Sequence, residues 1–119
     1  MKKNTTDTLF NSHSREDVLN CIKAGIDINA TNEYGENALF FCHHMNAVKA
    51  MIEAGIKVNH TDYDGNNALF SNHNPQVLEL LIHSGVNIQH KNNKGQSCLH
   101  WQRYDIDCAE LLINAGIDI

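Results

Sequence analysis

Apolar residues recur along this chain in short stripes separated by polar turns. Within a stripe the spacing is i, i+3, i+4, which is typical of a helix that buries one face. A glycine follows each stripe, and glycine readily adopts the left-handed conformation that ends a helix. The pattern therefore predicts four helices that each end at a glycine. Their stripes are Val18, Cys21 and Ile22; Val48, Met51 and Ile52; Val77 or Leu78, Leu81 and Ile82; and Ala109, Leu112 and Ile113.

These four predicted helices also carry start signals. Pro75 suits the first position of a helix, because its missing N–H would have no intrahelical partner there. Asn74 precedes it as a predicted N-cap, and the aligned residues in the other helices are Ser14, His44 and Asp105. Three of these are good N-cap types, whereas His44 is the exception.

The same skeleton returns about every 30 residues, since Gly65 has counterparts at Gly35 and Gly95. A fixed period in this range is typical of stacked repeats. The period divides one predicted domain, 1–119, into units 1–29, 30–59, 60–89 and 90–119. Each unit reads as a turn, a short helix, a second turn, a longer helix and an extended return. The predicted N-caps of the short helices are Asp7, Asn37, Asn67 and Ser97.

The repeated motif is G-x-[NS]-[AC]-L-[FH], followed by a helix ending in (Leu/Met)-Ile-x-(Ala/Ser)-Gly-(Ile/Val)-x-(Ile/Val). It resembles the ankyrin repeat, whose pattern runs from G-x-T-P-L-H to L-L-x-x-G-A-D-V-N. The resemblance implies an all-α, ankyrin-like solenoid of four stacked helix-turn-helix repeats with short hairpin loops. Ankyrin units have about 33 residues, so the first helix or the turn after it must be trimmed here. The family's histidine is replaced by Phe40 and Phe70.

Both ends of the predicted stack depart from the pattern. Thr5 stands where the repeat requires glycine, so unit one is interpreted as an N-terminal cap. Terminal repeats need a polar outer face, and Leu111 makes the last helix an imperfect cap. We therefore expect either that the chain continues beyond Ile119 or that a partner covers this end.

The resemblance implies that the loop tips and the short helices form a concave surface for a partner protein. The tips vary between units while their glycine is constant, and exposed tyrosines favour interfaces. Trp101 is expected to be either packing between units or an aromatic anchor. The predicted partner-binding residues are Glu33, Tyr34, Glu36, His44, Met45, Tyr63, Asp64, Asn66, Asn74, Asn93, Lys94, Gln96, Trp101, Arg103 and Tyr104. Unit three carries the acidic residues Asp62 and Asp64, whereas unit four carries the basic residues Lys91 and Lys94. This difference in charge would orient the partner.

The net charge of −5 and the lack of a basic run argue against nucleic acid as the partner. No signal peptide is expected, because the polar residues 4–8 follow Met1-Lys2-Lys3. The four cysteines show no metal or disulfide spacing and are interpreted as reduced core thiols. The expected protein is cytoplasmic, monomeric when free, away from membranes and without a cofactor.

The eight histidines leave an enzyme as an alternative. Zinc ligands lie about 2 Å from one ion, whereas stacked helices lie about 8–10 Å apart. Histidines in one repeat column, such as His13, His43 and His73, are therefore too far apart to share a metal. We expect neither a metal site nor catalytic residues, but a metal-dependent or hydrolytic enzyme using these turns stays open. A targeting module of a longer protein is the third reading.

Overall fold

The structure is a computed structural model that describes residues 6–119. Its elements are α1 (Thr6–Phe10), α2 (Arg15–Lys23), the 3-10 helix η1 (Ala38–Phe40), α3 (Met45–Glu53), the 3-10 helix η2 (Ala68–Phe70), α4 (Pro75–His83), α5 (Cys98–Gln102) and α6 (Ile106–Asn114). No strand occurs among these residues, so the fold is all-α, as the sequence predicts. Thr5 and the Met1-Lys2-Lys3 segment, on which two expectations rest, lie outside the described residues.

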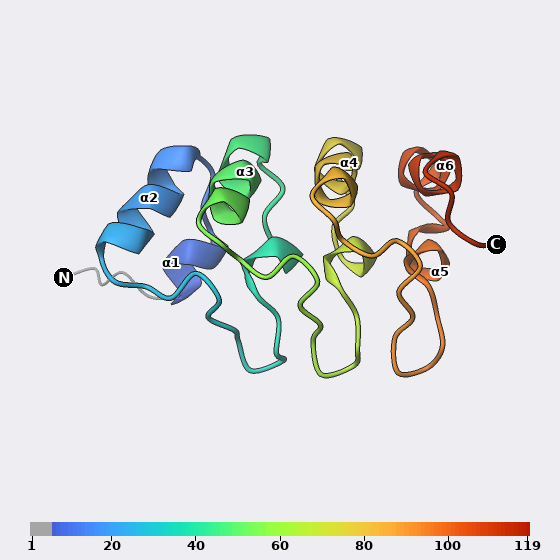
Figure 1. Ribbon diagram of the computed structural model, residues 1–119, viewed down its shortest axis with the longest axis horizontal. Coiled ribbons are helices and arrows are strands. Elements are labelled where there is room, and N and C mark those ends of the chain that lie inside the picture. Colours follow the sequence, from blue (N-terminus) through green and yellow to red (C-terminus); the bar gives the residue numbers. More distant parts are fainter. Residues whose placement is uncertain (1–5) are drawn as a thin grey trace.

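The helices form two parallel rows along the long axis of the molecule (Figure 1). The longer helices α2, α3, α4 and α6 lie side by side in one row, and α1, η1, η2 and α5 form the other. Three loops project beyond the second row; we call residues 32–36, 62–66 and 92–96 the tip loops. The overall extents are 48 × 26 × 22 Å. Units that are consecutive in sequence are therefore neighbours in space.

The longer helices begin where the sequence predicts. Their N-caps are Ser14, His44, Asn74 and Asp105, and every one except His44 accepts a backbone N–H through its side chain. The glycine after each of these helices has a positive φ, between 87° and 100°. The local start and stop signals thus fix the four longer helices.

The short helices explain the short repeat period. In units two and three the first helix is only three residues long. Asn37 and Asn67 cap these turns by accepting the N–H of Leu39 and Leu69. The first helix is therefore very short in these two units, which is one of the two places where the sequence predicts trimming. The prediction that Asp7 caps α1 is wrong, because Asp7 lies inside that helix.

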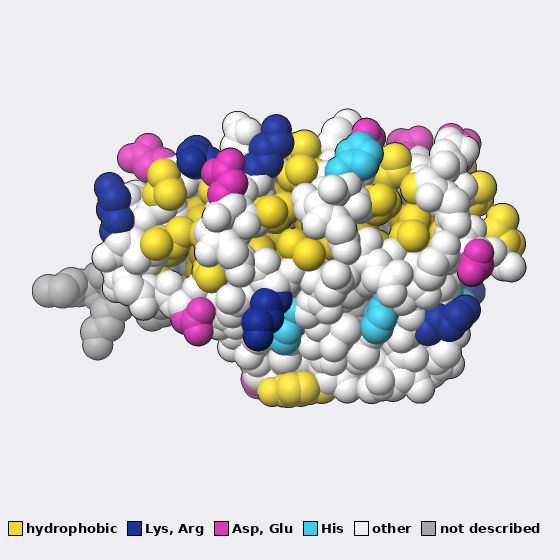
Figure 2. All heavy atoms as spheres, in the orientation of Figure 1, with side chains coloured by type: hydrophobic (Ala, Val, Ile, Leu, Met, Phe, Trp, Pro, Cys, Tyr) yellow, Lys and Arg dark blue, Asp and Glu magenta, His cyan; other side chains and the backbone are white. Residues whose placement is uncertain are grey.

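A continuous apolar core runs between the two rows. The first two positions of each predicted stripe are buried in α2, α3 and α4, but Ile22 at the end of the α2 stripe is 38% exposed. In α6 the buried pair is Cys108 and Leu112. Ile113, which was assigned to the stripe, is 45% exposed. The equivalent Ile52 and Ile82 are half-buried because α3 and α4 have neighbours on both sides. Hydrophobic side chains are visible along this row in Figure 2.

Buried amide side chains join neighbouring units. Gln102 is fully buried, and its Nε2 donates to the carbonyls of Leu69 and Asn72, at 2.9 and 2.7 Å. One unit earlier, Asn72 donates to the carbonyl of Cys42 at 2.8 Å. Because a buried backbone carbonyl without a donor is costly, this polar column fixes the register between units.

The segments that follow the longer helices carry a second set of hydrogen bonds from side-chain amides. Asn59 accepts the N–H of Asn87 at 2.7 Å and donates to the carbonyl of Gly85 at 3.0 Å. Gln89 makes the same two kinds of bond to Asp118 and Gly116. Each unit therefore holds the backbone of the next one through side-chain amides as well as apolar packing.

Candidate functional site

Each tip loop is shaped by the polar residue that opens it. Asp62 Oδ1 accepts the backbone N–H groups of Asp64 and Asn66, both at 2.9 Å. Asn32 and Asn92 make the same pair of bonds in their own loops. The side chain thus fixes the loop shape together with a backbone bond that closes each loop, in which the N–H of Asp62 donates to the carbonyl of Asn66 at 2.9 Å. This role for Asp62 is structural, although the sequence suggested only a contribution to charge.

Neighbouring tip loops are hydrogen-bonded to each other. The N–H of Tyr63 donates to the carbonyl of Tyr34 at 3.1 Å, and the N–H of Asn93 donates to that of Asp64 at 3.0 Å. Gly65 has φ +80°, and a Cβ on it would lie 2.9 Å from the backbone nitrogen of Asn93. Only glycine fits this left-handed turn and close approach. The three tips therefore form one continuous ridge.

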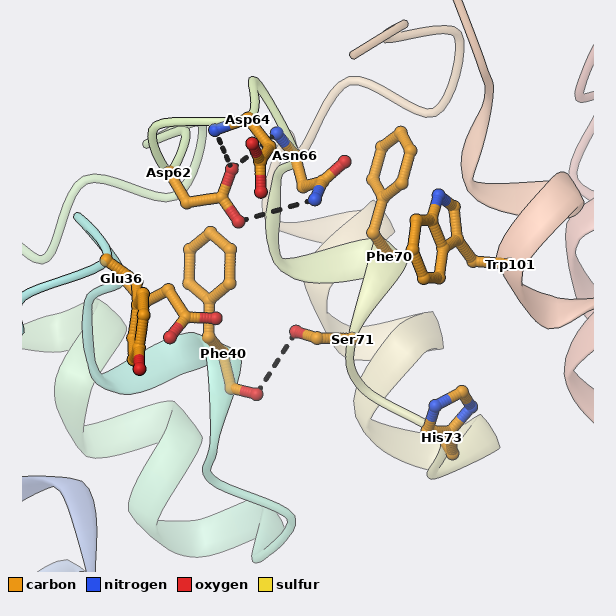
Figure 3. Close-up of a pocket in the computed structure, with 10 residues that line it drawn as sticks. Glu36, Phe40, Asp62, Asp64, Asn66, Phe70, Ser71, His73 and Trp101 are labelled. Carbon is orange, nitrogen blue, oxygen red and sulfur yellow. Dashed lines mark hydrogen bonds between the residues drawn. The ribbon is translucent and has the colours of Figure 1, made fainter. Parts of the chain in front are cut away.

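A hollow of about 520 Å³ lies between the tip loops and the short helices of units two to four. We call it the large hollow; Figure 3 draws its lining residues and labels all of them except Tyr34. Its aromatic walls come from Phe40 and Phe70, with Trp101 beside Phe70, while Asp62 and Asp64 lie at the tip-loop side. The full lining is Tyr34, Glu36, Phe40, Asp62, Asp64, Asn66, Phe70, Ser71, His73 and Trp101.

A second hollow of about 140 Å³ adjoins the first one. We call it the small hollow; its lining is Asp64, Asn66, Asn92, Asn93, Lys94, Gln96 and Trp101. Asp64, Asn66 and Trp101 line both hollows. The two hollows are therefore neighbours, and we call the pair the groove; it lies across the tips of units two to four.

This groove brings together eight of the fifteen predicted partner-binding residues: Tyr34, Glu36, Asp64, Asn66, Asn93, Lys94, Gln96 and Trp101. Trp101 is 49% exposed, so its indole is neither ordinary core packing nor a free surface side chain. It forms part of the wall shared by both hollows. Of the two roles that the sequence left open, this position suits an anchor.

The other seven predicted residues do not line the groove. Glu33 is exposed on its tip loop, and the ring of Tyr63 packs over Gly35. Met45 is half-buried in a different groove, between α3 and α4 on the row of longer helices. The remaining four are placed as follows: His44 stacks on His13, Asn74 caps α4, Arg103 lies over the Tyr104 ring, and Tyr104 is 85% exposed.

Six lining residues were not predicted as binding residues, namely Phe40, Asp62, Phe70, Ser71, His73 and Asn92. Phe40 and Phe70 were interpreted only as space-filling aromatics, and each is indeed 97% buried by its neighbours. One edge of each ring nevertheless faces the large hollow. The sequence did contain one signal of this role, because both phenylalanines stand where the ankyrin motif has histidine.

Four histidines act as cross-links between units. His60 Nε2 lies 2.6 Å from the carbonyl of Gly35, and His90 Nε2 lies 2.7 Å from that of Gly65. His73 Nδ1 lies 2.7 Å from Gln102 Oε1, and His43 Nδ1 makes the equivalent contact with Asn72. Since these partners are acceptors, the ring nitrogens carry protons and donate. No group of three or more metal-ligating side chains is gathered within residues 6–119.

All four cysteines are buried free thiols, as the sequence predicts. Burial raises the pKa of Cys98 to about 11, and burial together with Asp105 raises the pKa of Cys108 to about 12. Thiols with such high pKa values stay protonated at neutral pH and are poor nucleophiles. The neutral thiols of Cys98 and Cys108 contribute fully to the stability of the fold below pH 9. This contribution is lost as the pH rises through their raised pKa values.

Comparison with protein-family models gives no match, and comparison with curated protein sequences gives none either. Within residues 6–119, every helix is too short or too polar to cross a bilayer. The function is therefore inferred from the residues and their geometry.

Proposed function

We propose that this protein is an ankyrin-like repeat module, a solenoid of four units that binds another protein through its tip loops and short helices. The groove carries the proposal: an elongated surface, framed by hydrogen-bonded tips, exposes an indole and a tyrosine beside carboxylates and amides. Tyrosine and tryptophan are enriched at interfaces and among their energetic anchors. The protein would act as an adaptor or an inhibitor, without chemistry of its own.

The remaining polar groups support binding over catalysis. Ser71 donates its hydroxyl hydrogen bond to the carbonyl of Phe40, and His73 donates to Gln102. Both side chains are therefore engaged in holding units together. A nucleophile and a base need to bond to each other and to face a reacting group. A cytoplasmic, monomeric adaptor remains the form of the protein that we propose.

The test is affinity capture from a lysate of the source cell with matched variants. In one variant Tyr34→Ala is combined with Trp101→Ala, which removes both exposed aromatic rings from the groove. The control is Tyr104→Ala, which removes an exposed ring outside it. We expect the first variant to lose the captured partner at least tenfold, as is usual for anchor residues, with an unchanged melting temperature. Equal capture by both variants would contradict the proposal.

A further inference from the structure

The large hollow combines aromatic rings with carboxylates. Phe40, Phe70 and Trp101 supply ring edges and faces, and Tyr34 adds a phenol that is 64% exposed. Figure 3 shows the carboxylates of Asp62 and Asp64 on the tip-loop side and that of Glu36 beside Phe40. A ligand that fills this space must therefore offer apolar surface and satisfy negative charge together.

The negative charge of this hollow is not neutralised from within. Asp62 is occupied by its own loop, and Glu36 Oε1 accepts from the amide of Asn32 at 3.0 Å. The carboxylate of Asp64 has no hydrogen-bond partner among residues 6–119. No lysine or arginine within that range lines the large hollow, and Lys94 lines only the small one.

These features select the chemistry of the ligand. A neutral apolar side chain would strip water from the carboxylates without replacing its hydrogen bonds, which is unfavourable. An acidic side chain would be repelled. A guanidinium group can stack on an indole face and donate two parallel hydrogen bonds to a carboxylate, whereas an ammonium group offers only a compact charge. Arginine therefore fits better than lysine.

The shape of the groove favours an extended segment as the carrier of this side chain. The large hollow adjoins the small one at Asp64, Asn66 and Trp101, which line both. The small hollow offers the amides of Asn93 and Gln96, which can bond to the backbone of an extended chain. A volume of about 520 Å³ is within the usual range for ligand pockets.

We propose that the large hollow binds an arginine side chain on an extended segment of the partner protein, with the guanidinium group between the Trp101 indole and the Asp64 carboxylate. This inference rests on the proposed function and adds the chemistry of the partner. Lys94, which lines only the small hollow, then favours an acidic residue elsewhere in the same segment.

The probe is a displayed library of random linear peptides, selected against the intact protein at low salt. We expect the enriched peptides to contain arginine. Each is then synthesised with arginine or with citrulline, which has the same shape without the charge. Trp101 is the only tryptophan in the chain, so its fluorescence reports occupation of the groove directly. Citrulline should weaken binding at least tenfold, because hydrogen bonds to charged groups contribute about 1.5–3 kcal/mol.

Matched variants test whether the Asp64 carboxylate is the group that binds the guanidinium. Asp64→Asn should weaken the arginine peptide about tenfold and remove the difference between arginine and citrulline. Glu79→Gln removes a carboxylate from the groove on the longer helices and should change neither.

The outcomes separate the two proposals. Enriched peptides that contain no arginine, citrulline peptides of equal affinity, or no enrichment at all would overturn the arginine assignment. If peptides still need Trp101 but not arginine, the binding module stands without this assignment. If neither Trp101→Ala nor Asp64→Asn affects any peptide, both proposals fail.

Discussion

At the scale of single residues, buried amides link neighbouring units in addition to the apolar core. Gln102 uses both ends of its amide: Nε2 donates to two carbonyls of unit three, and Oε1 accepts from His73. Each partner would lack a hydrogen bond without it. The sequence did not mark this role, because glutamine on a short helix is usually exposed.

Replacing Gln102 with methionine should destabilise the protein strongly. Methionine has a similar volume but leaves two buried carbonyls without donors, and each unsatisfied group costs about 1–3 kcal/mol. We expect a loss of about 3 kcal/mol in the free energy of unfolding, measured by urea denaturation. Gln76→Met is the control, because Gln76 is exposed on α4 and should cost less than about 0.5 kcal/mol. Equal effects would contradict the structural role assigned to Gln102.

At the scale of elements, local sequence signals were enough to predict where the longer helices begin and end. Asn74 with Pro75 and the glycine after the last turn act within a few residues, so the sequence predicted the bounds of α4 well. Trimming of the first helix was also predictable, but not its reduction to one 3-10 turn. That form depends on a contact far along the chain: the amide of Asn67 donates to the carbonyl of Asn87 at 3.1 Å.

The caps of the short helices provide a matched pair of substitutions. Asn67 accepts from Leu69 and donates to Asn87, whereas Ser97 makes no side-chain capping bond to α5. Asn67→Ala should therefore lower the free energy of unfolding by about 2 kcal/mol, and Ser97→Ala by less than about 0.5 kcal/mol. Thermal and urea unfolding of both variants would check this. A larger loss of unfolding free energy for Ser97→Ala than for Asn67→Ala would contradict the capping role assigned to Asn67.

The groove was harder to predict than the helices. Tip residues such as Tyr34 and Lys94 were found because they vary between units where the fold requires only glycine. Met45 was misplaced because its side of α3 depends on how the two rows of helices pack. Tyr63 is 74% exposed, as the sequence predicted, but its ring also lies over Gly35, and a contact between two tips cannot be predicted from one unit.

At the scale of the whole molecule, the two rows of helices present two different surfaces. The tip loops and short helices carry the aromatic and acidic groove, whereas the longer helices carry a shallower groove lined by Met45, Lys49 and Leu80. Exposed apolar side chains also lie on α6, where Ile106 is 71% exposed and Ile113 is 45% exposed. Half-buried Leu111, by contrast, packs against the core.

The most direct measurement is a map of amide chemical-shift changes by NMR when the tightest selected peptide is added. The account predicts changes at the three tip loops, in η1, η2 and α5, and at the Trp101 indole N–H. Residues of α3 and α4 that face the other groove should not shift. Changes concentrated on those longer helices, with the Trp101 signal unmoved, would contradict the claim that the tip-loop groove is the binding surface.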